Sequence, residues 1–138
     1  MLEINPKKFK HIQNKTIPSP LRPKFRNSQD TNMYFLSKRR FEGKDPEPRK
    51  DVRGGSIKNS YCLPFNELIT ENHTFKNSKD ILNKFSSLLG SSYDEEIVFS
   101  CGSGVTATVL ALAYSMINNK YTPTIYDGSW AEYGKLKL

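Results

Sequence analysis

The stretch FSCGSGVTAT, residues 99–108, carries the features that decide the fold class. The largely apolar run Glu96-Ile97-Val98-Phe99, in an expected strand over residues 96–100, leads to Cys101, and two glycines follow it. A helical apolar pattern then begins at about Gly104 and continues to Ile117. A buried strand, a glycine-containing turn and a helix in this order are typical of α/β domains with parallel strands. The stretch therefore predicts a strand that presents a cysteine at its carboxyl end.

The remainder of the chain predicts further strands and helices in alternation. Apolar residues at helical spacing indicate a helix over residues 79–89, with Ser78 as its N-cap and Gly90 as its C-terminal stop. Short strands are expected at 33–36, 61–63 and 123–126, a short helix within 64–70, and a polar loop over 40–60. The buried side of the helix over 104–117 is expected to consist of Val105, Val109, Leu112, Ala113, Met116 and Ile117. We therefore expect a single α/β domain with a mainly parallel central sheet flanked by helices.

The net charge of +7 is concentrated at the N-terminus. Residues 1–30 contribute +5 of it and contain four of the eight prolines. This composition predicts an irregular, basic lead-in over residues 1–31, with an arm that binds a polyanion as the alternative. Neither an aromatic-rich RNA-binding signature nor zinc-ligand spacing accompanies the charge, so we expect no nucleic-acid partner.

Membrane association and secretion are not indicated by the sequence. No run of apolar residues approaches the length that crosses a bilayer. The N-terminus lacks the apolar region of a secretory signal, and its prolines argue against an amphipathic transit helix. The two cysteines, Cys62 and Cys101, are too few for a disulfide framework and suit a reducing compartment. These features predict a cytoplasmic protein.

The surroundings of Cys101 suit an activated nucleophile. Gly102 and Gly104 allow backbone N–H groups to converge on one point, and the following helix N-terminus adds its positive dipole end. Both effects favour a thiolate, and Ser103 and Thr106 are further hydroxyl donors. From this local pattern alone, a buried structural cysteine in a glycine turn is the alternative interpretation.

Two kinds of phosphate chemistry are excluded by the same residues. Residues 102–104 lack the lysine of a phosphate-binding P-loop. A cysteine phosphatase requires an arginine six residues after its nucleophile, and Ala107 stands at that position.

Four ordered motifs resemble the second, catalytic domain of the 3-mercaptopyruvate sulfurtransferases, in the rhodanese superfamily. They are CGSGVTA at 101–107, RFEG and DPEPR within 40–49, RGG and LPF within 53–65, and YDGSW at 126–130. The resemblance extends from about residue 32 to residue 134. It implies a rhodanese-like catalytic domain over residues 32–138 and a lead-in over 1–31 that resembles an interdomain linker. It also implies that the family's N-terminal rhodanese domain is absent.

The resemblance implies a reaction and its residues. Cys101 is expected to be the nucleophile that takes sulfur from 3-mercaptopyruvate as a persulfide and passes it to a thiol or to cyanide. Arg40 and Arg49 are expected to bind the substrate carboxylate, because a guanidinium matches a carboxylate bidentately. The charge of the persulfide is expected to be stabilised by the loop residues Gly102, Ser103, Gly104, Val105 and Thr106. The reaction requires no metal and no organic cofactor.

The uncharged loop at residues 102–104 favours 3-mercaptopyruvate over thiosulfate, because thiosulfate-using relatives typically carry Arg and Lys there. The expected partners are a small-molecule sulfur donor and a thiol acceptor, thioredoxin-like or of low molecular weight. Self-association or a separate N-terminal domain is expected to cover the exposed side of the site. Two alternatives stay open, a non-catalytic sulfur-carrier module and a degenerate fragment with little activity.

Two positions depart from the family's pattern. Ser56-Ile57-Lys58-Asn59 replaces the usual His-Ile-Pro-Gly after the glycine pair, and the Asp-Ala-Arg that precedes the RF motif is missing. We expect the first departure to alter the local turn. Cys62, which lies in an expected strand, is interpreted as a core residue that could resolve a persulfide only by approaching Cys101.

Overall fold

The computed structural model describes residues 10–12, 31–35, 37–90, 97–120 and 123–136. Five strands form one sheet in the order β1-β5-β4-β2-β3, and every neighbouring pair is parallel. The strands are β1 (Lys10–Ile12), β2 (Thr31–Phe35), β3 (Ser60–Cys62), β4 (Ile97–Cys101) and β5 (Thr124–Tyr126). The expected α/β architecture with a parallel sheet is confirmed.

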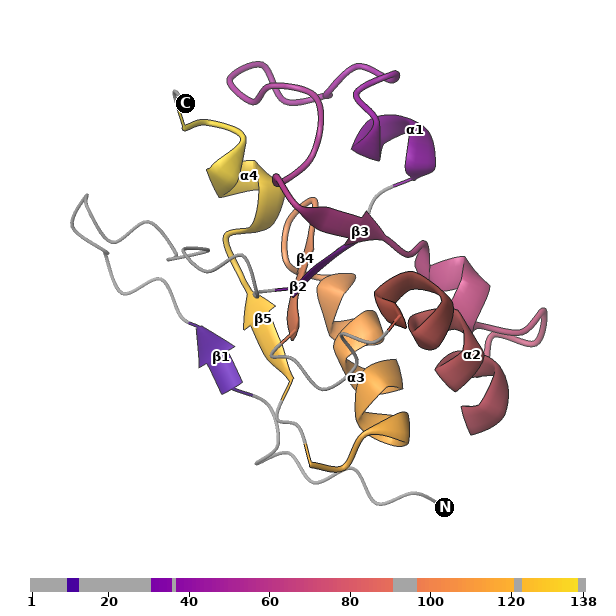
Figure 1. The fold of residues 1–138 in the computed structure, drawn as a ribbon. Helices are drawn as coiled ribbons and strands as arrows, with labels where there is room; N and C mark the ends of the chain where they lie inside the picture. The colour runs from indigo at the N-terminus through magenta and orange to yellow at the C-terminus, as the bar shows by residue number, and fades with distance from the viewer. Residues whose placement is uncertain (1–9, 13–30, 36, 91–96, 121–122, 137–138) are drawn as a thin grey trace.

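The carboxyl ends of the strands meet at one edge of the sheet because the strands are parallel. β4 lies between β2 and β5, and Phe35 at the end of β2 is in register with Cys101 at the end of β4. Two short helices, α1 (Lys38–Phe41) and α4 (Ser129–Tyr133), lie beyond this edge together with the loop over residues 42–59 (Figure 1). Ligands of open parallel sheets bind at such an edge, so the cysteine ends where a site is expected.

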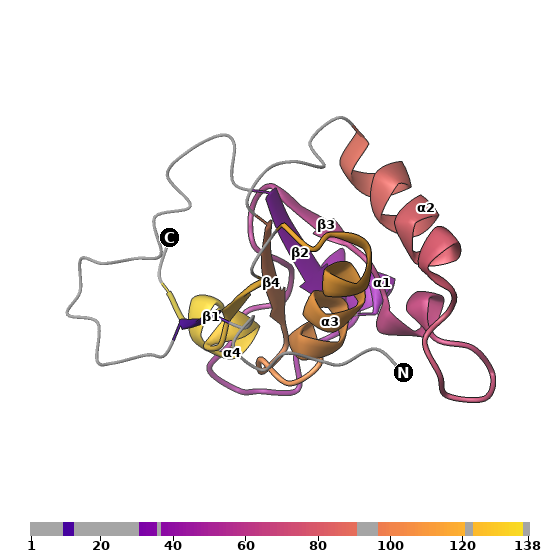
Figure 2. The same ribbon diagram turned by 90° about the horizontal axis from the view of Figure 1, so that it is seen from below.

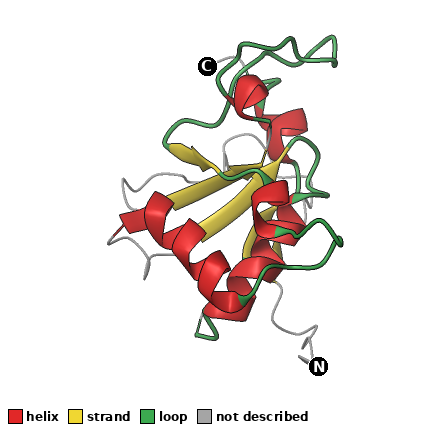
Figure 3. Cartoon of the chain, turned by 90° about the vertical axis from the view of Figure 1, so that its right-hand side faces the viewer, coloured by secondary structure: helices red, strands yellow, loops and turns green. Residues whose placement is uncertain are grey.

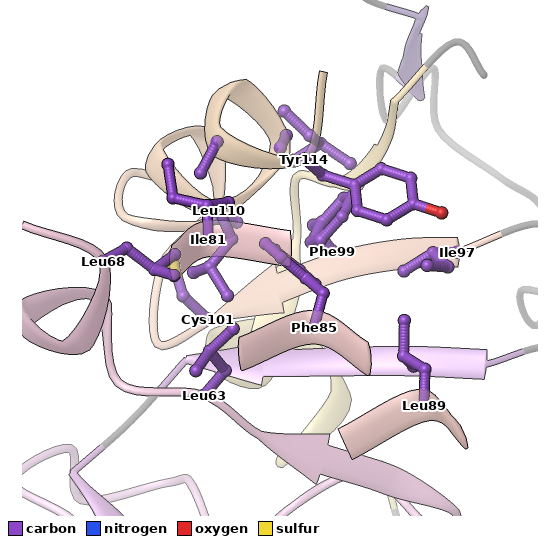
Figure 4. Close-up of a cluster of buried hydrophobic side chains, with 14 residues drawn as sticks. Leu63, Leu68, Ile81, Phe85, Leu89, Ile97, Phe99, Cys101, Leu110 and Tyr114 are labelled. Atoms are coloured by element: carbon purple, nitrogen blue, oxygen red, sulfur yellow. The ribbon is translucent and has the colours of Figure 1, made fainter. Parts of the chain in front are cut away.

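The two longer helices, α2 (Ser78–Leu89) and α3 (Ala107–Ile117), pack side by side on one face of the sheet (Figures 1 and 2). Figure 3 shows the helices and loops around the single sheet. The core between these helices and the strands contains Phe85, Phe99 and Tyr114, whose rings meet edge to face or tilted, with 5.1 Å between the ring centroids of Phe85 and Tyr114. Ile97 and Cys101 point into the same cluster (Figure 4).

The other face of the sheet carries a second, smaller cluster. Val98 alternates with Ile97 and Phe99 along β4 and so packs on this opposite side, as the pleat of a strand requires. The buried members of the second cluster are Val52, Ile57, Tyr126 and Trp130. The indole N–H of Trp130 donates to the carbonyl of Arg53 at 2.7 Å. The loop before β3 is therefore fastened to α4.

Several element boundaries differ from the sequence-based expectations. α3 begins at Ala107 rather than near Gly104, because residues 102–106 form turns. Of its expected buried side, Ala113 is buried and Met116 and Ile117 pack against the main cluster. The expectation is otherwise wrong, because the other buried residues are Ala107, Leu110, Ala111 and Tyr114. Val105 is 72% exposed. The N-cap of α2 is Asn77, whose side chain accepts from the backbone N–H of Asp80, and not Ser78.

The short elements at the sheet edge and at the N-terminus were not expected. α1 lies where the polar loop over residues 40–60 was predicted to begin, and α4 follows β5 directly. β1 lies inside the lead-in that was expected to be irregular, and it pairs with β5 from Lys10↔Thr124 to Ile12↔Tyr126. The expectation of an irregular segment is therefore wrong for residues 10–12. The short helix expected within 64–70 is the 3-10 helix η2 (Phe65–Leu68).

Candidate active site

Cys101 is the last residue of β4 and is 1% exposed. Apolar side chains of the main cluster, including Leu63 and Leu68, lie on one side of it (Figure 4). Burial by itself raises the pKa of the thiol. Hydrogen bonds from the Thr106 hydroxyl and from the backbone at Ser103, Ala107 and Thr106 lower the pKa, and together they outweigh burial. The pKa of Cys101 therefore lies below its ordinary value, which favours the nucleophilic thiolate.

The turn that brings these donors to the sulfur depends on Gly104. Its φ of +86° lies in a region that side chains rarely adopt, and a Cβ there would lie 2.6 Å from the carbonyl oxygen of Asp127. The backbone of the loop therefore touches the segment after β5. A hydrogen bond joins the same two segments, because the backbone N–H of Ala131 donates to the carbonyl of Gly102 at 2.9 Å.

Ser129 fastens the same segment to the cysteine itself. Its hydroxyl accepts from the backbone N–H of Cys101 at 3.0 Å and donates to the carbonyl of Tyr126 at 2.8 Å. Ser129 is fully buried, and its φ of +47° is unusual for a residue with a side chain. Sequence reasoning did not single out this serine. The signal for it was present, because Ser129 is part of the YDGSW motif.

Arg40 and Arg49 meet at a shared carboxylate. Nη2 of Arg40 lies 3.0 Å from Oε2 of Glu47, and Nη1 of Arg49 lies 2.8 Å from Oε1 of the same residue. The structure therefore brings the two arginines together as an ion cluster with Glu47, which was not among the expected site residues. Arg40 lies in α1, which follows β2, the neighbour of β4 in the sheet. Arg40 and Cys101 thus belong to the same edge of the sheet.

The expected loop residues have different environments. Ser103 and Thr106 contribute hydrogen bonds that lower the pKa of Cys101, and so does Ala107, which was not among the expected residues. Gly104 is buried against Asp127. The Val105 side chain points to solvent. A persulfide-stabilising role for the loop stays a prediction.

Within the described ranges, no group of three or more His, Cys, Asp and Glu side chains is placed to hold a metal ion. None of the described helices is long and apolar enough to cross a membrane.

Comparison with known proteins shows what this chain is similar to. The chain is 40% identical over 97 residues to the mitochondrial thiosulfate/3-mercaptopyruvate sulfurtransferase 1 of Arabidopsis thaliana. The matched segment covers 70% of this chain and 25% of the Arabidopsis protein. The 3-mercaptopyruvate sulfurtransferase of Escherichia coli, a solved rhodanese-fold structure, matches 76% of this chain and 37% of its own with 31% identity and a TM-score of 0.61. The chain has a rhodanese fold. It is homologous to part of the 3-mercaptopyruvate sulfurtransferases.

A yeast structure gives the same result. The sub-stoichiometric sulfur transferase subunit of yeast mitochondrial complex I is 34% identical to this chain, with a TM-score of 0.67. The match covers 83% of this chain and 37% of the yeast subunit. No protein-family model matches the chain. The chain spans about a quarter of the Arabidopsis relative and about a third of these solved proteins.

The departure from the usual pattern at residues 56–59 is accommodated in the rhodanese fold. Asn59 takes a positive φ of 60°, a conformation that asparagine tolerates better than most residues. Ile57 is buried in the second cluster, and its carbonyl accepts from the Ser60 hydroxyl. The turn is therefore built with other residues than those of the usual pattern.

The side chains of Cys62 and Cys101 project from opposite faces of the sheet, so Cys62 is not placed to resolve a persulfide on Cys101. Tyr34 of the intervening strand is in register with both Cys62 and Ser100, so Cys62 aligns with the neighbour of Cys101. Because successive residues of a strand point to opposite faces, the two cysteines project from opposite faces. Two strand spacings, about 9–10 Å in total, also separate them. A disulfide between them is excluded without movement of the backbone.

Proposed function

We propose that this chain carries out the persulfide step of a sulfurtransferase, with 3-mercaptopyruvate as donor and a thiol or cyanide as acceptor. The observation that carries the proposal is the environment of Cys101, a buried thiol whose pKa is lowered by a hydroxyl and three backbone hydrogen bonds. Such a set of donors also suits the negative charge of a persulfide. The homology to 3-mercaptopyruvate sulfurtransferases supports the donor class.

The proposed reaction balances without a cofactor. The Cys101 thiolate attacks the sulfur of 3-mercaptopyruvate, a sulfur–sulfur bond forms, and the carbon–sulfur bond breaks. The electron pair of the broken bond passes to the enolate of pyruvate, which takes up the proton that the substrate thiol loses. The products are pyruvate and a Cys101 persulfide anion. An acceptor thiol or cyanide then takes the outer sulfur and regenerates the thiolate.

The arginines give the proposed site its affinity for the donor. Arg40 and Arg49 lie with their guanidinium groups on Glu47, and each guanidinium has further N–H donors that a substrate carboxylate can use. The loop at residues 102–104 is uncharged, which favours 3-mercaptopyruvate over thiosulfate. A cytoplasmic location stays a prediction, and the Arabidopsis relative is a mitochondrial protein.

The test is mass spectrometry of the purified chain after incubation with 3-mercaptopyruvate, together with an assay of released pyruvate. We expect a gain of one sulfur atom on the peptide that contains Cys101 and release of an equal amount of pyruvate. The matched control is Cys62→Ser, which should still gain the sulfur, whereas Cys101→Ser should not. An unmodified wild-type chain at millimolar donor would refute the proposal.

A sulfur-carrier function is the second candidate, because the hydrogen-bond donors around Cys101 would equally hold a persulfide that a donor protein delivers. A carrier would release no pyruvate but would accept sulfur at Cys101 from a donor protein that already holds a persulfide. A degenerate fragment, by contrast, would show no cooperative thermal transition.

A further inference from the structure

We propose that Glu47 tunes substrate selection by charge: its carboxylate lowers the net charge of the Arg40–Arg49 cluster to one positive charge, which weakens binding of a dianion such as thiosulfate more than binding of a monoanionic 2-oxo acid. This inference rests on the proposed function, because it concerns the site at which the sulfur donor would bind. It assigns Glu47 a role in specificity that differs from the carboxylate-binding role of the arginines.

Glu47 is built into the loop as the centre of the cluster. Its side chain is 5% exposed, whereas those of Arg40 and Arg49 are 30% and 36% exposed. Oε1 accepts from Nη1 of Arg49 at 2.8 Å and from the backbone N–H of Arg49 at 3.3 Å, and Oε2 accepts from Nη2 of Arg40 at 3.0 Å. Both carboxylate oxygens are therefore occupied by the arginines.

The backbone around Glu47 keeps the carboxylate in this position. Pro46 and Pro48 flank it, and a following proline restricts a residue to extended conformations. The neighbouring Asp45 does not join the cluster, because it accepts from Nε of Arg39 at 2.8 Å. Arg39 is mostly exposed, so this second pair forms at the surface of the same loop.

The cluster retains capacity for one more acceptor. Nε of Arg40 is buried and has no hydrogen-bond partner among the residues that the structure describes. A buried donor without an acceptor is unfavourable, so an anion that reaches it gains a hydrogen bond at little cost. The two guanidinium groups together with one carboxylate carry a single net positive charge, which a single carboxylate of a ligand neutralises.

The net charge of the cluster affects the binding energy of a dianion more than that of a monoanion. Coulomb energy scales with the product of the charges, so removing the negative charge of Glu47 strengthens the attraction for a dianion twice as much as for a monoanion. Mercaptopyruvate has one carboxylate and a thiol that is protonated at neutral pH, whereas thiosulfate carries two charges. Glu47→Gln should therefore strengthen the binding of thiosulfate more than the binding of 3-mercaptopyruvate.

The experiment compares wild-type chain, Glu47→Gln and two controls at low ionic strength, each after a cooperative thermal melt shows that it is folded. The readout is the ratio of kcat/KM for thiosulfate to kcat/KM for 3-mercaptopyruvate. We expect Glu47→Gln to raise this ratio on the order of tenfold. Glu47→Asp keeps the charge and should leave the ratio near the wild-type value. Asp45→Asn removes the same charge from the same loop without touching the cluster, and should also leave the ratio unchanged.

A binding measurement separates this inference from the proposed function. Calorimetry with pyruvate as the monoanion and sulfate as the dianion needs no turnover, so it applies even to a chain that releases no pyruvate. We expect wild-type chain to bind sulfate no more than about tenfold tighter than pyruvate, and Glu47→Gln to shift the preference toward sulfate. If Glu47→Gln does not fold, Glu47→Met replaces it, because it removes the charge without burying an amide.

Three results overturn the inference. The first is a kcat/KM ratio that stays unchanged in the folded, uncharged Glu47 variant, and the second is an equal change of that ratio in Asp45→Asn. The third is wild-type chain that binds sulfate much more than about tenfold tighter than pyruvate. If wild-type chain releases pyruvate in the first case, the proposed function stands and only the role of Glu47 is wrong. If no pyruvate is released but the binding preference shifts as expected, the proposed function fails and charge selection by Glu47 is supported.

Discussion

The hydroxyl of Ser129 accepts a hydrogen bond from the backbone N–H of Cys101 at 3.0 Å, although 28 positions separate the two residues in the chain. The same hydroxyl donates to the carbonyl of Tyr126. One buried side chain thus connects the carboxyl end of β5 to that of β4. The position of the candidate nucleophile is consequently set by a residue from the last part of the chain.

Ser129→Ala should destabilise the fold by about 2 kcal/mol, because it removes the two buried hydrogen bonds that the hydroxyl makes to the N–H of Cys101 and the carbonyl of Tyr126. Urea-induced unfolding measures the free energy of unfolding. The matched control is Ser115→Ala, which removes a hydroxyl that donates to the carbonyl of Leu112 within the same helix, α3. A loss in Ser129→Ala no larger than in Ser115→Ala would contradict the importance of the connection.

Thr106→Val should raise the pKa of Cys101, because the variant loses the hydroxyl that donates to the sulfur and keeps the burial that opposes ionisation. Alkylation of Cys101, followed by peptide mass spectrometry across a pH series, should become severalfold slower near neutral pH. Thr108→Val is the control, since its hydroxyl donates to the carbonyl of Val105 instead. Identical pH profiles for Thr106→Val and wild-type chain would show that the hydroxyl does not act on the thiolate.

The lowered pKa of Cys101 also predicts a dependence of stability on pH. Ionisation of a thiol whose pKa is lower in the folded state stabilises that state, and the gain is lost as pH falls through the folded-state pKa. The free energy of unfolding of wild-type chain should therefore rise relative to that of Cys101→Ser as pH increases through this range. A difference between the two that is independent of pH would contradict the lowered pKa.

Gly104→Ala should destabilise the fold by about 2–4 kcal/mol, since the new Cβ would meet Asp127 and the positive φ is strained for any other residue. Gly54→Ala is the control, because a Cβ there meets no atom within 4 Å. Thermal melting of both variants gives the comparison. Equal melting temperatures would mean that the loop can move away from Asp127.

Phe85→Ala should cost about 3–5 kcal/mol, because Phe85 is fully buried and its ring contacts Phe99 and Tyr114. The control Leu82→Ala lies on the same helix with a partly exposed side chain and should cost much less. If Phe85→Ala does not fold, Phe85→Leu should still cost more than Leu82→Ala. Similar losses from the two positions would indicate that the packing between α2 and the sheet contributes little.

Local patterns sufficed for the elements with strong spacing signals. Helical spacing of apolar residues and the stop at Gly90 predicted α2, and the apolar run before Cys101 predicted β4. The short elements α1, α4 and β1 were missed because helices of four or five residues and strands of three have little stability of their own. They form where the rest of the fold supplies contacts, as Trp130 of α4 does with Arg53.

The sequence by itself determined the parallel α/β class, the cysteine at a strand end and the glycine turn behind it, because these depend on neighbours within a few positions. Only the tertiary structure decided that Ser129 holds Cys101, that Glu47 joins Arg40 to Arg49, and that Cys62 faces away from Cys101. Each of these depends on strand order or on the path of a loop. The physical reason is that packing of the whole chain, and not local propensity, sets distances between residues far apart in sequence.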